Sequence, residues 1–69
     1  MKMSARNQLR GKVKTVKPGA VMAEVVVELA GGQEVVAAIT LSSAQELNLK
    51  VGDDVVAIIK STEVMIGIE

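Results

Sequence analysis

Two short segments of this sequence are rich in hydrogen-bond donors and contain no acidic residue. The first, Ser4–Gln8, holds a hydroxyl, a guanidinium and two amides, and the second, Lys60–Thr62, holds an ammonium and two hydroxyls. A small multivalent anion needs several converging N–H and O–H groups together with balancing positive charge. If the fold or an oligomer brings the segments together, they predict a pocket for such an anion. In the alternative interpretation, Arg6 and Lys60 are solvated surface cations.

The charge of the predicted anion determines which groups its pocket must contain. An oxyanion with two negative charges loses hydration when it is enclosed, so its site must return hydrogen bonds and nearly neutralise the charge. Arg6 and Lys60 together balance a dianion. The hydroxyls of Ser4, Ser61 and Thr62 are further donors, and backbone N–H groups of the first segment would complete the cage.

Catalytic chemistry has little support among the residue types. The chain has no histidine, cysteine or tyrosine, which removes most general bases and all thiol chemistry. A serine nucleophile would need Lys60 beside Ser61, but neighbouring residues on a strand point to opposite faces. The carboxylates show no calcium-loop spacing, and a zinc site lacks its usual ligands. We therefore expect a protein that is not an enzyme and has neither catalytic residues nor a metal site.

The size and composition of the chain favour an oligomer. A chain of 69 residues buries only about 60% of its unfolded surface, which makes a lone monomer marginal. No disulfide is available, yet 49% of the residues are hydrophobic and none is aromatic. The sequence shows no apolar run of the roughly 20 residues that span a membrane and no signal-peptide core. We expect a cytoplasmic protein that associates with copies of itself and not with a membrane.

The basic residues are concentrated near one end of the sequence, which raises a second functional hypothesis. Met1–Lys17 holds six of the eight cations and no acid, whereas every acid lies from Glu24 onward. This edge would suit a small DNA-binding or regulatory β module. Single-strand and RNA modules stack bases on aromatic side chains, however, and this chain has none, which argues against nucleic acid as a partner. A purely structural oligomerisation domain is the third hypothesis.

Alternating apolar and polar residues predict three strands in the first 41 residues and further strands near the end of the chain. The first three expected strands are joined by a Pro-Gly turn over residues 17–20 and by a turn at residues 31–32. On the second strand, one face carries only apolar residues and would point to the core. The three expected strands cover Gln8–Lys17, Val21–Leu29 and Glu34–Leu41.

A short helix is predicted between the third and fourth strands. Ser43 with Glu46 three residues later reads as a capping box, and Ser42 with Gln45 is the alternative register. The helix would have about two turns. The leucines that follow it, at positions 47 and 49, would plug one end of a barrel.

Two further strands complete the predicted fold. Val55–Ile59 is apolar on both faces, which in so small a protein suggests a subunit interface. Glu63–Ile68 alternates again and is expected to form a fifth strand. The order of three strands, a helix and two strands predicts an all-β, five-stranded OB-like small barrel with one short helix. We expect residues 1–69 to form a single domain.

The donor segments belong to a longer pattern that resembles a known family. Ser4–Val13, Leu47, Val51–Gly52 and Ala57–Ile66 look like the molbindins, the small Mop-type molybdate-binding proteins with a Mop or TOBE domain. That domain is similar to the C-terminal anion-binding modules of molybdate transporter ATPases and molybdate-responsive regulators. The SARNQL opening paired with the IIKST run carries the resemblance, which covers nearly the whole chain.

The resemblance implies a homohexamer, a trimer of dimers, that holds molybdate or tungstate as bound ligand at its subunit interfaces. The implied function is intracellular binding, storage and homeostasis of these oxyanions. Residues of one subunit would meet residues of a neighbour in the main class of site, and a second class would lie near the three-fold axis. The oxyanion-binding residues carried over are Ser4, Ala5, Arg6 and Asn7 from one subunit with Lys60 and Ser61 from another, and the second site falls around Gly19, Ala20 and Val21.

Overall fold

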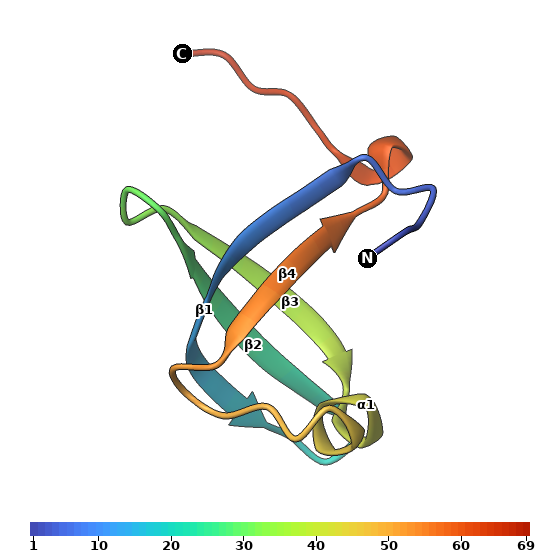
Figure 1. Cartoon of the computed structure of the whole chain (residues 1–69), viewed down its shortest axis with the longest axis vertical. Helices are drawn as coiled ribbons and strands as arrows, with labels where there is room; N and C mark the ends of the chain where they lie inside the picture. Colours follow the sequence, from blue (N-terminus) through green and yellow to red (C-terminus); the bar gives the residue numbers. More distant parts are fainter.

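A computed structural model describes residues 1–69 and shows four strands, one short α-helix and one 3₁₀ turn (Figure 1). The strands form one antiparallel sheet in the order β3-β2-β1-β4. The chain is therefore all-β apart from the short helix, as predicted. The elements in chain order are β1 (Asn7–Pro18), β2 (Met22–Leu29), β3 (Glu34–Thr40), α1 (Leu41–Glu46), β4 (Asp54–Ile59) and the 3₁₀ turn η1 (Ser61–Glu63).

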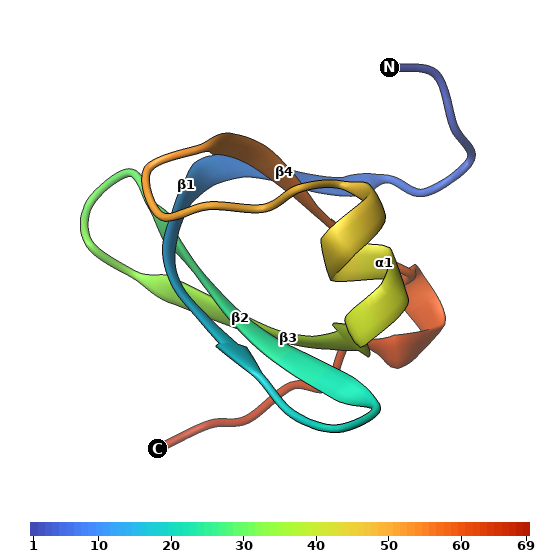
Figure 2. The ribbon, with the colours of Figure 1, turned by 90° about the horizontal axis from the view of Figure 1, so that it is seen from below.

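The long strand β1 organises the sheet because it pairs with two different strands along its length. Its first half, from Asn7, pairs with β4, and its second half, from Gly11, pairs with β2. The register shifts between Val13 and Thr15, and such a bulge increases the local twist. At Gly11 the two backbones approach so closely that a Cβ atom would lie 2.5 Å from the Glu28 carbonyl oxygen. The sheet consequently curls into an open barrel (Figure 2).

Both predicted hairpins are confirmed. At the turn between β1 and β2, the N–H of Gly19 donates to the carbonyl of Met22 at 2.7 Å. The turn between β2 and β3 needs glycine because Gly31 and Gly32 both have φ near +90°, which side chains disfavour. The N–H of Leu29 there donates to the carbonyl of Gln33 at 2.7 Å.

The core lies inside the curl and consists of small, mostly β-branched residues. The apolar face predicted for β2 is confirmed, since its central residues are all buried. Leu49 packs against this core, as expected of a plug, whereas Leu47 is 67% exposed and the prediction for it was wrong. The buried residues are Val13, Ala23, Val25, Val27 and Ala44.

The helix α1 begins two or three residues earlier than the capping-box prediction. Its N-cap is Thr40, whose hydroxyl accepts a hydrogen bond from the N–H of Ser43 at 3.1 Å. The same hydroxyl donates to the Ser43 hydroxyl at 2.7 Å. Ser42 and Ser43 therefore lie inside the helix and do not cap it. The sequence pattern did not identify Thr40 as the cap because Thr40 also fits the alternation of β3. In the structure it is both the last residue of that strand and the N-cap of α1.

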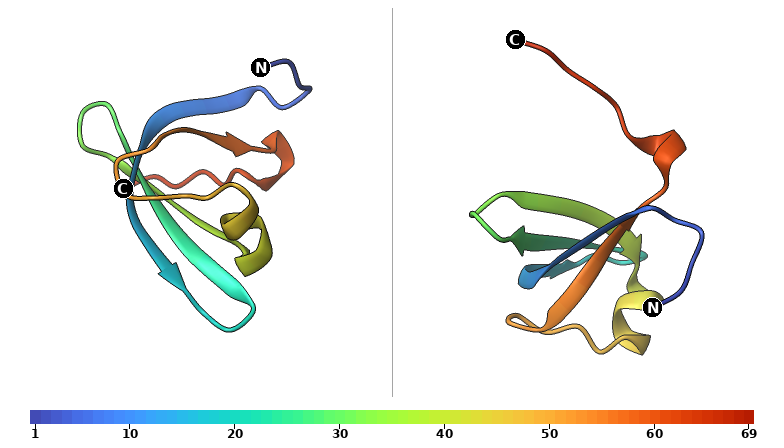
Figure 3. Two further views of the ribbon diagram at one scale, coloured as in Figure 1. Left: turned by 60° about the horizontal axis from the view of Figure 1, so that its bottom comes forward. Right: turned by 45° about the horizontal axis from the view of Figure 1, so that its top comes forward.

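The predicted fifth strand does not form within this chain. After β4 the backbone makes the turn η1, and residues 64–69, hereafter the tail, lead away from the sheet (Figures 1 and 3). The tail has no strand beside it, so its N–H and C=O groups join no ladder. Its apolar residues are correspondingly bare, with Ile66 91% and Ile68 98% exposed. Neither helix of the structure is long and apolar enough to cross a lipid bilayer.

Candidate functional site

The fold brings the two donor segments to the same end of the sheet. Asn7 pairs with Ile59, which is the last pair between β1 and β4. Ser4–Asn7 therefore enters the sheet beside the point at which Lys60 and Ser61 leave it (Figure 1). We call these two segments together the donor end. Residues separated by more than fifty positions in sequence are thus neighbours in one chain, and whether an anion also needs a second subunit stays a prediction.

The charged and hydroxyl side chains of the donor end face solvent without partners in the chain. Ser4, Arg6, Lys60 and Ser61 are exposed, while Ala5 and Asn7 are half-buried. None of the ion pairs involves Arg6 or Lys60, and no side-chain hydrogen bond joins the two segments. Two cations without a counter-ion therefore extend from neighbouring backbone segments, an arrangement that suits a dianion.

Local hydrogen bonds fix the backbone on both sides of the donor end. The side-chain amide of Gln8 donates to the carbonyl of Ala5 at 2.7 Å, so this amide supports the segment and is not a free donor. In η1, the N–H of Glu63 donates to the carbonyl of Lys60 at 2.9 Å. This turn begins at Ser61, directly after Lys60. The donors therefore sit on backbone whose course is set by short-range contacts.

The second predicted site lies at the opposite end of β1. Gly19, Ala20 and Val21 form the exposed turn that follows this strand. The carbonyl of Val21 accepts from the N–H of Leu41 at 2.8 Å, which ties the turn to the start of α1. A small cleft of about 270 Å³ beside the turn is lined by residues of β1, α1 and the loop after it. The two predicted sites are thus too far apart to share one anion.

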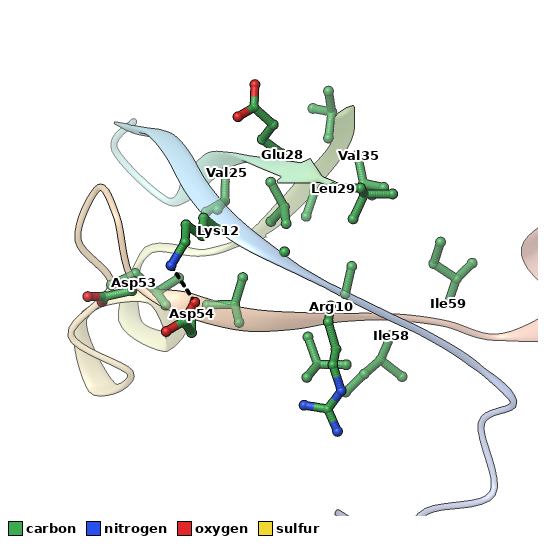
Figure 4. Close-up of a pocket in the computed structure, with 18 of the residues that line it drawn as sticks. Arg10, Lys12, Val25, Glu28, Leu29, Val35, Asp53, Asp54, Ile58 and Ile59 are labelled. Atoms are coloured by element: carbon green, nitrogen blue, oxygen red, sulfur yellow. Dashed lines mark hydrogen bonds and ion pairs between the residues drawn. The ribbon is translucent and has the colours of Figure 1, made fainter. Parts of the chain in front are cut away.

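The largest concavity is an open trough of about 1590 Å³ between the edge strands β3 and β4 (Figure 4). Hydrophobic side chains make up 17 of its 23 lining residues, and none of the predicted oxyanion-binding residues is among them. An apolar trough cannot repay the lost hydration of an anion, so it is not the anion site. The sequence had indicated only part of it, through the apolar character of β4.

Ion pairs at the rim of the trough and on the outer face of the sheet neutralise part of the basic edge. Lys12 Nζ lies 2.7 Å from Asp54 Oδ1, and its hydrogen bond and charge hold the pKa of that carboxyl below its usual value. Lys14 contacts Glu34, and the hydrogen bond raises the pKa of the lysine. Two of the cations that motivated the DNA-binding hypothesis are therefore already paired with acids, which weakens that hypothesis.

No cluster of three or more metal-ligating side chains is present. Chemically, the chain offers an end with two unpaired cations, hydroxyls and backbone donors, and an apolar trough that no segment fills. The first can bind an anion and the second can bind apolar side chains.

Proteins of known family and known structure are similar to this chain over nearly its whole length. The family model described as "TOBE domain" matches residues 3–66. The molybdenum-pterin-binding protein 3 of Clostridium pasteurianum is 56% identical over 66 residues, which cover 96% of this chain and 97% of that protein. The structure of MopII from Clostridium pasteurianum superposes with a TM-score of 0.92 at 51% identity, covering 97% of this chain and 100% of that one.

A third relative was solved with its ligand. The cytoplasmic molybdate-binding protein ModG, in a form with molybdate bound, superposes with a TM-score of 0.85 at 46% identity. The match covers 88% of this chain and 43% of ModG. The resemblance seen in the SARNQL and IIKST runs is therefore confirmed. The chain belongs to the TOBE domain family and, within it, to the group of the Mop-type molybdenum-pterin-binding proteins.

Proposed function

We propose that this protein binds molybdate or tungstate and stores these oxyanions inside the cell. The observation that carries the proposal is the donor end, where two cations without counter-ions lie at neighbouring strand ends. Support comes from the relatives, one of which is named a molybdate-binding protein and was solved with molybdate bound. That relative is described as cytoplasmic, which supports the same compartment for this chain. The protein acts by binding and is not an enzyme.

The donor end supplies the chemistry that a doubly charged tetrahedral anion requires. Arg6 and Lys60 balance its two charges, and Ser4 and Ser61 donate through their hydroxyls. Backbone N–H groups of Ala5, Arg6 and Asn7 add donors that cost no side-chain ordering. The anion is the stored ligand in this mechanism, and the residues only bind it, neutralise it and exclude water from it.

Exposure of these residues in a single chain supports the proposal that a second subunit completes the pocket. An anion on an open surface keeps most of its hydration and gains little from each contact, whereas an enclosed one gains more from every donor. We therefore place the pocket at a subunit interface of a homohexamer built as a trimer of dimers. The turn at Gly19, Ala20 and Val21, being exposed, is available for the second class of site.

Calorimetry on protein freed of bound anion tests the proposal. Molybdate and tungstate should each release heat and saturate, and Lys60→Ala should weaken both by about 10-fold to 100-fold, because a charged hydrogen bond contributes about 1.5–3 kcal/mol. Lys50→Ala is the matched control, since this exposed lysine lies in the loop before β4 and has no ion pair. Absence of binding in the parent protein, or equal losses in both variants, would contradict the proposal.

A further inference from the structure

The segment Ser4–Arg6 is tied to the rest of the chain by a single hydrogen bond. It lies before β1, which begins at Asn7, and no strand pairs with it. None of residues 1–6 takes part in a backbone–backbone hydrogen bond or in an ion pair. Their one hydrogen bond comes from the Gln8 side chain, whose Nε2 donates to the Ala5 carbonyl at 2.7 Å. The course of this segment therefore depends on a side chain outside the set of proposed oxyanion-binding residues.

We propose that Gln8 is a positioning residue of the donor end. Its side-chain amide holds the Ala5 carbonyl, and this contact keeps the N–H of Arg6 in one direction and free to bind the oxyanion. Gln8 acts through the backbone of the preceding segment and does not itself bind the anion. The inference rests on the proposed function, because it adds a residue to the same site.

The peptide unit between Ala5 and Arg6 connects the two groups. A peptide unit is planar, so in its trans form the C=O and the N–H point in opposite directions. The chain has no cis peptide bond. The bond from Gln8 to the Ala5 carbonyl therefore also fixes the direction of the Arg6 N–H, which points away from the glutamine amide. No acceptor within the chain receives this N–H, so it is left for a ligand.

Gln8 can serve as an anchor because its own backbone belongs to the sheet. It pairs with Ile58 across β1 and β4, one position inside the last pair of these strands. From there its side chain reaches back three residues to Ala5. Lys60 follows directly after the end of β4. Gln8 thus links the segment before β1 to the strand end from which the second cation of the donor end extends.

The expected benefit to binding is preorganisation. Without the glutamine amide, the unit between Ala5 and Arg6 would rotate among several orientations, and an incoming anion would have to order it. A group that is already held in its bound orientation avoids this cost, which raises affinity without adding a contact to the ligand. Gln8 is exposed, so the gain should be that of one ordinary hydrogen bond, about 3-fold to 10-fold in affinity.

Two other roles for Gln8 lead to different expectations. A residue that contacts the anion directly would change affinity but leave the anion-free donor end as it is. A residue that only stabilises the fold would lower the free energy of unfolding. The positioning role predicts a change in the backbone of Arg6 before any anion binds, with unfolding nearly unchanged because residues 1–6 lie outside the sheet.

The first measurement is calorimetry with molybdate on protein freed of bound anion. Gln8→Met keeps an unbranched side chain of similar length but has no N–H to donate, and it should weaken molybdate binding by about 3-fold to 10-fold. Gln33→Met is the matched control, because this exposed glutamine lies in the turn between β2 and β3 and its side chain has no hydrogen bond. The control should stay within about twofold of the parent. Equal affinities of Gln8→Met and the parent, or equal losses in both variants, would overturn the inference.

The second measurement follows the Arg6 amide itself by ¹⁵N relaxation in the anion-free protein. Its order parameter should be near that of rigid backbone in the parent and in Gln33→Met, about 0.85, and should fall below about 0.6 in Gln8→Met. Urea unfolding of the three proteins should give the same midpoint, which separates positioning from a general loss of stability. Weaker molybdate binding with an unchanged Arg6 order parameter would mean that Gln8 contacts the anion, and this result too would overturn the inference.

Failure of the positioning role and failure of the proposed function give different results. A parent protein that binds neither molybdate nor tungstate would contradict the proposed function and, with it, the role of Gln8. A parent that binds molybdate, together with a Gln8→Met variant that binds it equally well, would overturn the positioning role alone. Weaker binding by Gln8→Met with a mobile Arg6 amide is the result that supports both.

Discussion

The donor end and the trough differ in the kind of surface that each leaves to solvent. The donor end exposes polar groups that form hydrogen bonds with water. Its exposure therefore costs little free energy and leaves its cations available to bind an anion. The trough exposes apolar side chains and unpaired strand edges, for which water is a poor substitute. Filling the trough should therefore contribute stability, whereas filling the donor end should contribute binding. Substitutions in one region should leave the property of the other nearly unchanged.

The largest expected effect is on binding at the donor end. Arg6→Ala combined with Lys60→Ala removes both unpaired cations, and we expect anion affinity to fall by about 1000-fold or more, since each charged hydrogen bond is worth about 1.5–3 kcal/mol. The free energy of unfolding of the anion-free protein should stay within about 0.5 kcal/mol, because both side chains are exposed. Calorimetry and urea unfolding measure the two quantities. Affinity within tenfold of the parent would mean that backbone N–H groups alone hold the anion.

For the core beneath the trough, we expect a substitution to lower the free energy of unfolding and to leave anion affinity nearly unchanged. Val25 is 3% exposed and packs with Val13 and Val27, so Val25→Ala should lower the free energy of unfolding by about 2 kcal/mol through lost burial and a small cavity. Val36→Ala is the control, because Val36 is 62% exposed in a single chain and should cost much less. Equal losses would show that another subunit covers Val36. Urea unfolding at matched protein concentrations is the measurement.

The curl that opens the trough depends on Gly11. A Cβ atom there would lie 2.5 Å from the Glu28 carbonyl oxygen and 2.7 Å from Val27 Cγ1, so Gly11→Ala should cost about 1–3 kcal/mol through overpacking. Gly67→Ala meets nothing within 4 Å and provides the comparison. We expect thermal unfolding to shift only for Gly11→Ala. An unchanged midpoint for that variant would mean that the close approach of β1 and β2 relaxes freely.

The helix cap at the far end of the trough has a smaller expected effect. Thr40→Ala removes the hydroxyl that accepts from the Ser43 N–H and should cost about 1 kcal/mol. Ser43→Ala removes the residue first expected to cap and should cost less, because its N–H still reaches Thr40. Denaturant unfolding of the two variants decides between the caps, and a larger loss for Ser43→Ala would reverse the assignment.

The smallest expected effect is a pH dependence from the exposed pair at the rim. The hydrogen bond and charge of Lys12 lower the folded-state pKa of Asp54 below its unfolded value, so the pair stabilises the protein above that value. The contribution is lost as pH falls through the folded-state pKa. The parent should therefore lose slightly more thermal stability than Asp54→Asn between pH 6 and pH 2. Parallel midpoints across this range would show that the pair is too screened to contribute.

Local patterns predicted the strands well because each depends on residues close in sequence. The alternation in β2 identified its buried face, and the glycines at residues 31 and 32 identified a turn that needs positive φ. The helix start was misplaced because Thr40 satisfies a strand pattern and a cap pattern at once. The sequence therefore predicted the strands and the glycine turn, but it did not predict the residue at which β3 ends and α1 begins.

The expected fifth strand shows a different limit. The alternation of Val64, Ile66 and Ile68 is typical of a strand, but a strand also needs a neighbour, and the chain supplies none. No sequence pattern reports whether a neighbour is available. Whether residues 64–69 find a neighbouring strand depends on the direction of the backbone after η1 and on where the edges of the sheet lie.

The sequence by itself determined which groups are available: two acid-free donor segments, an excess of branched apolar residues, and no histidine, cysteine or tyrosine. These follow from residue types and need no coordinates. Only the tertiary structure decided that the donor segments lie at one end of the sheet, that the trough stays open, and that the tail leaves it empty. The physical reason is that pairing between β1 and β4 joins residues about fifty positions apart, and such long-range contacts leave no trace in local periodicity.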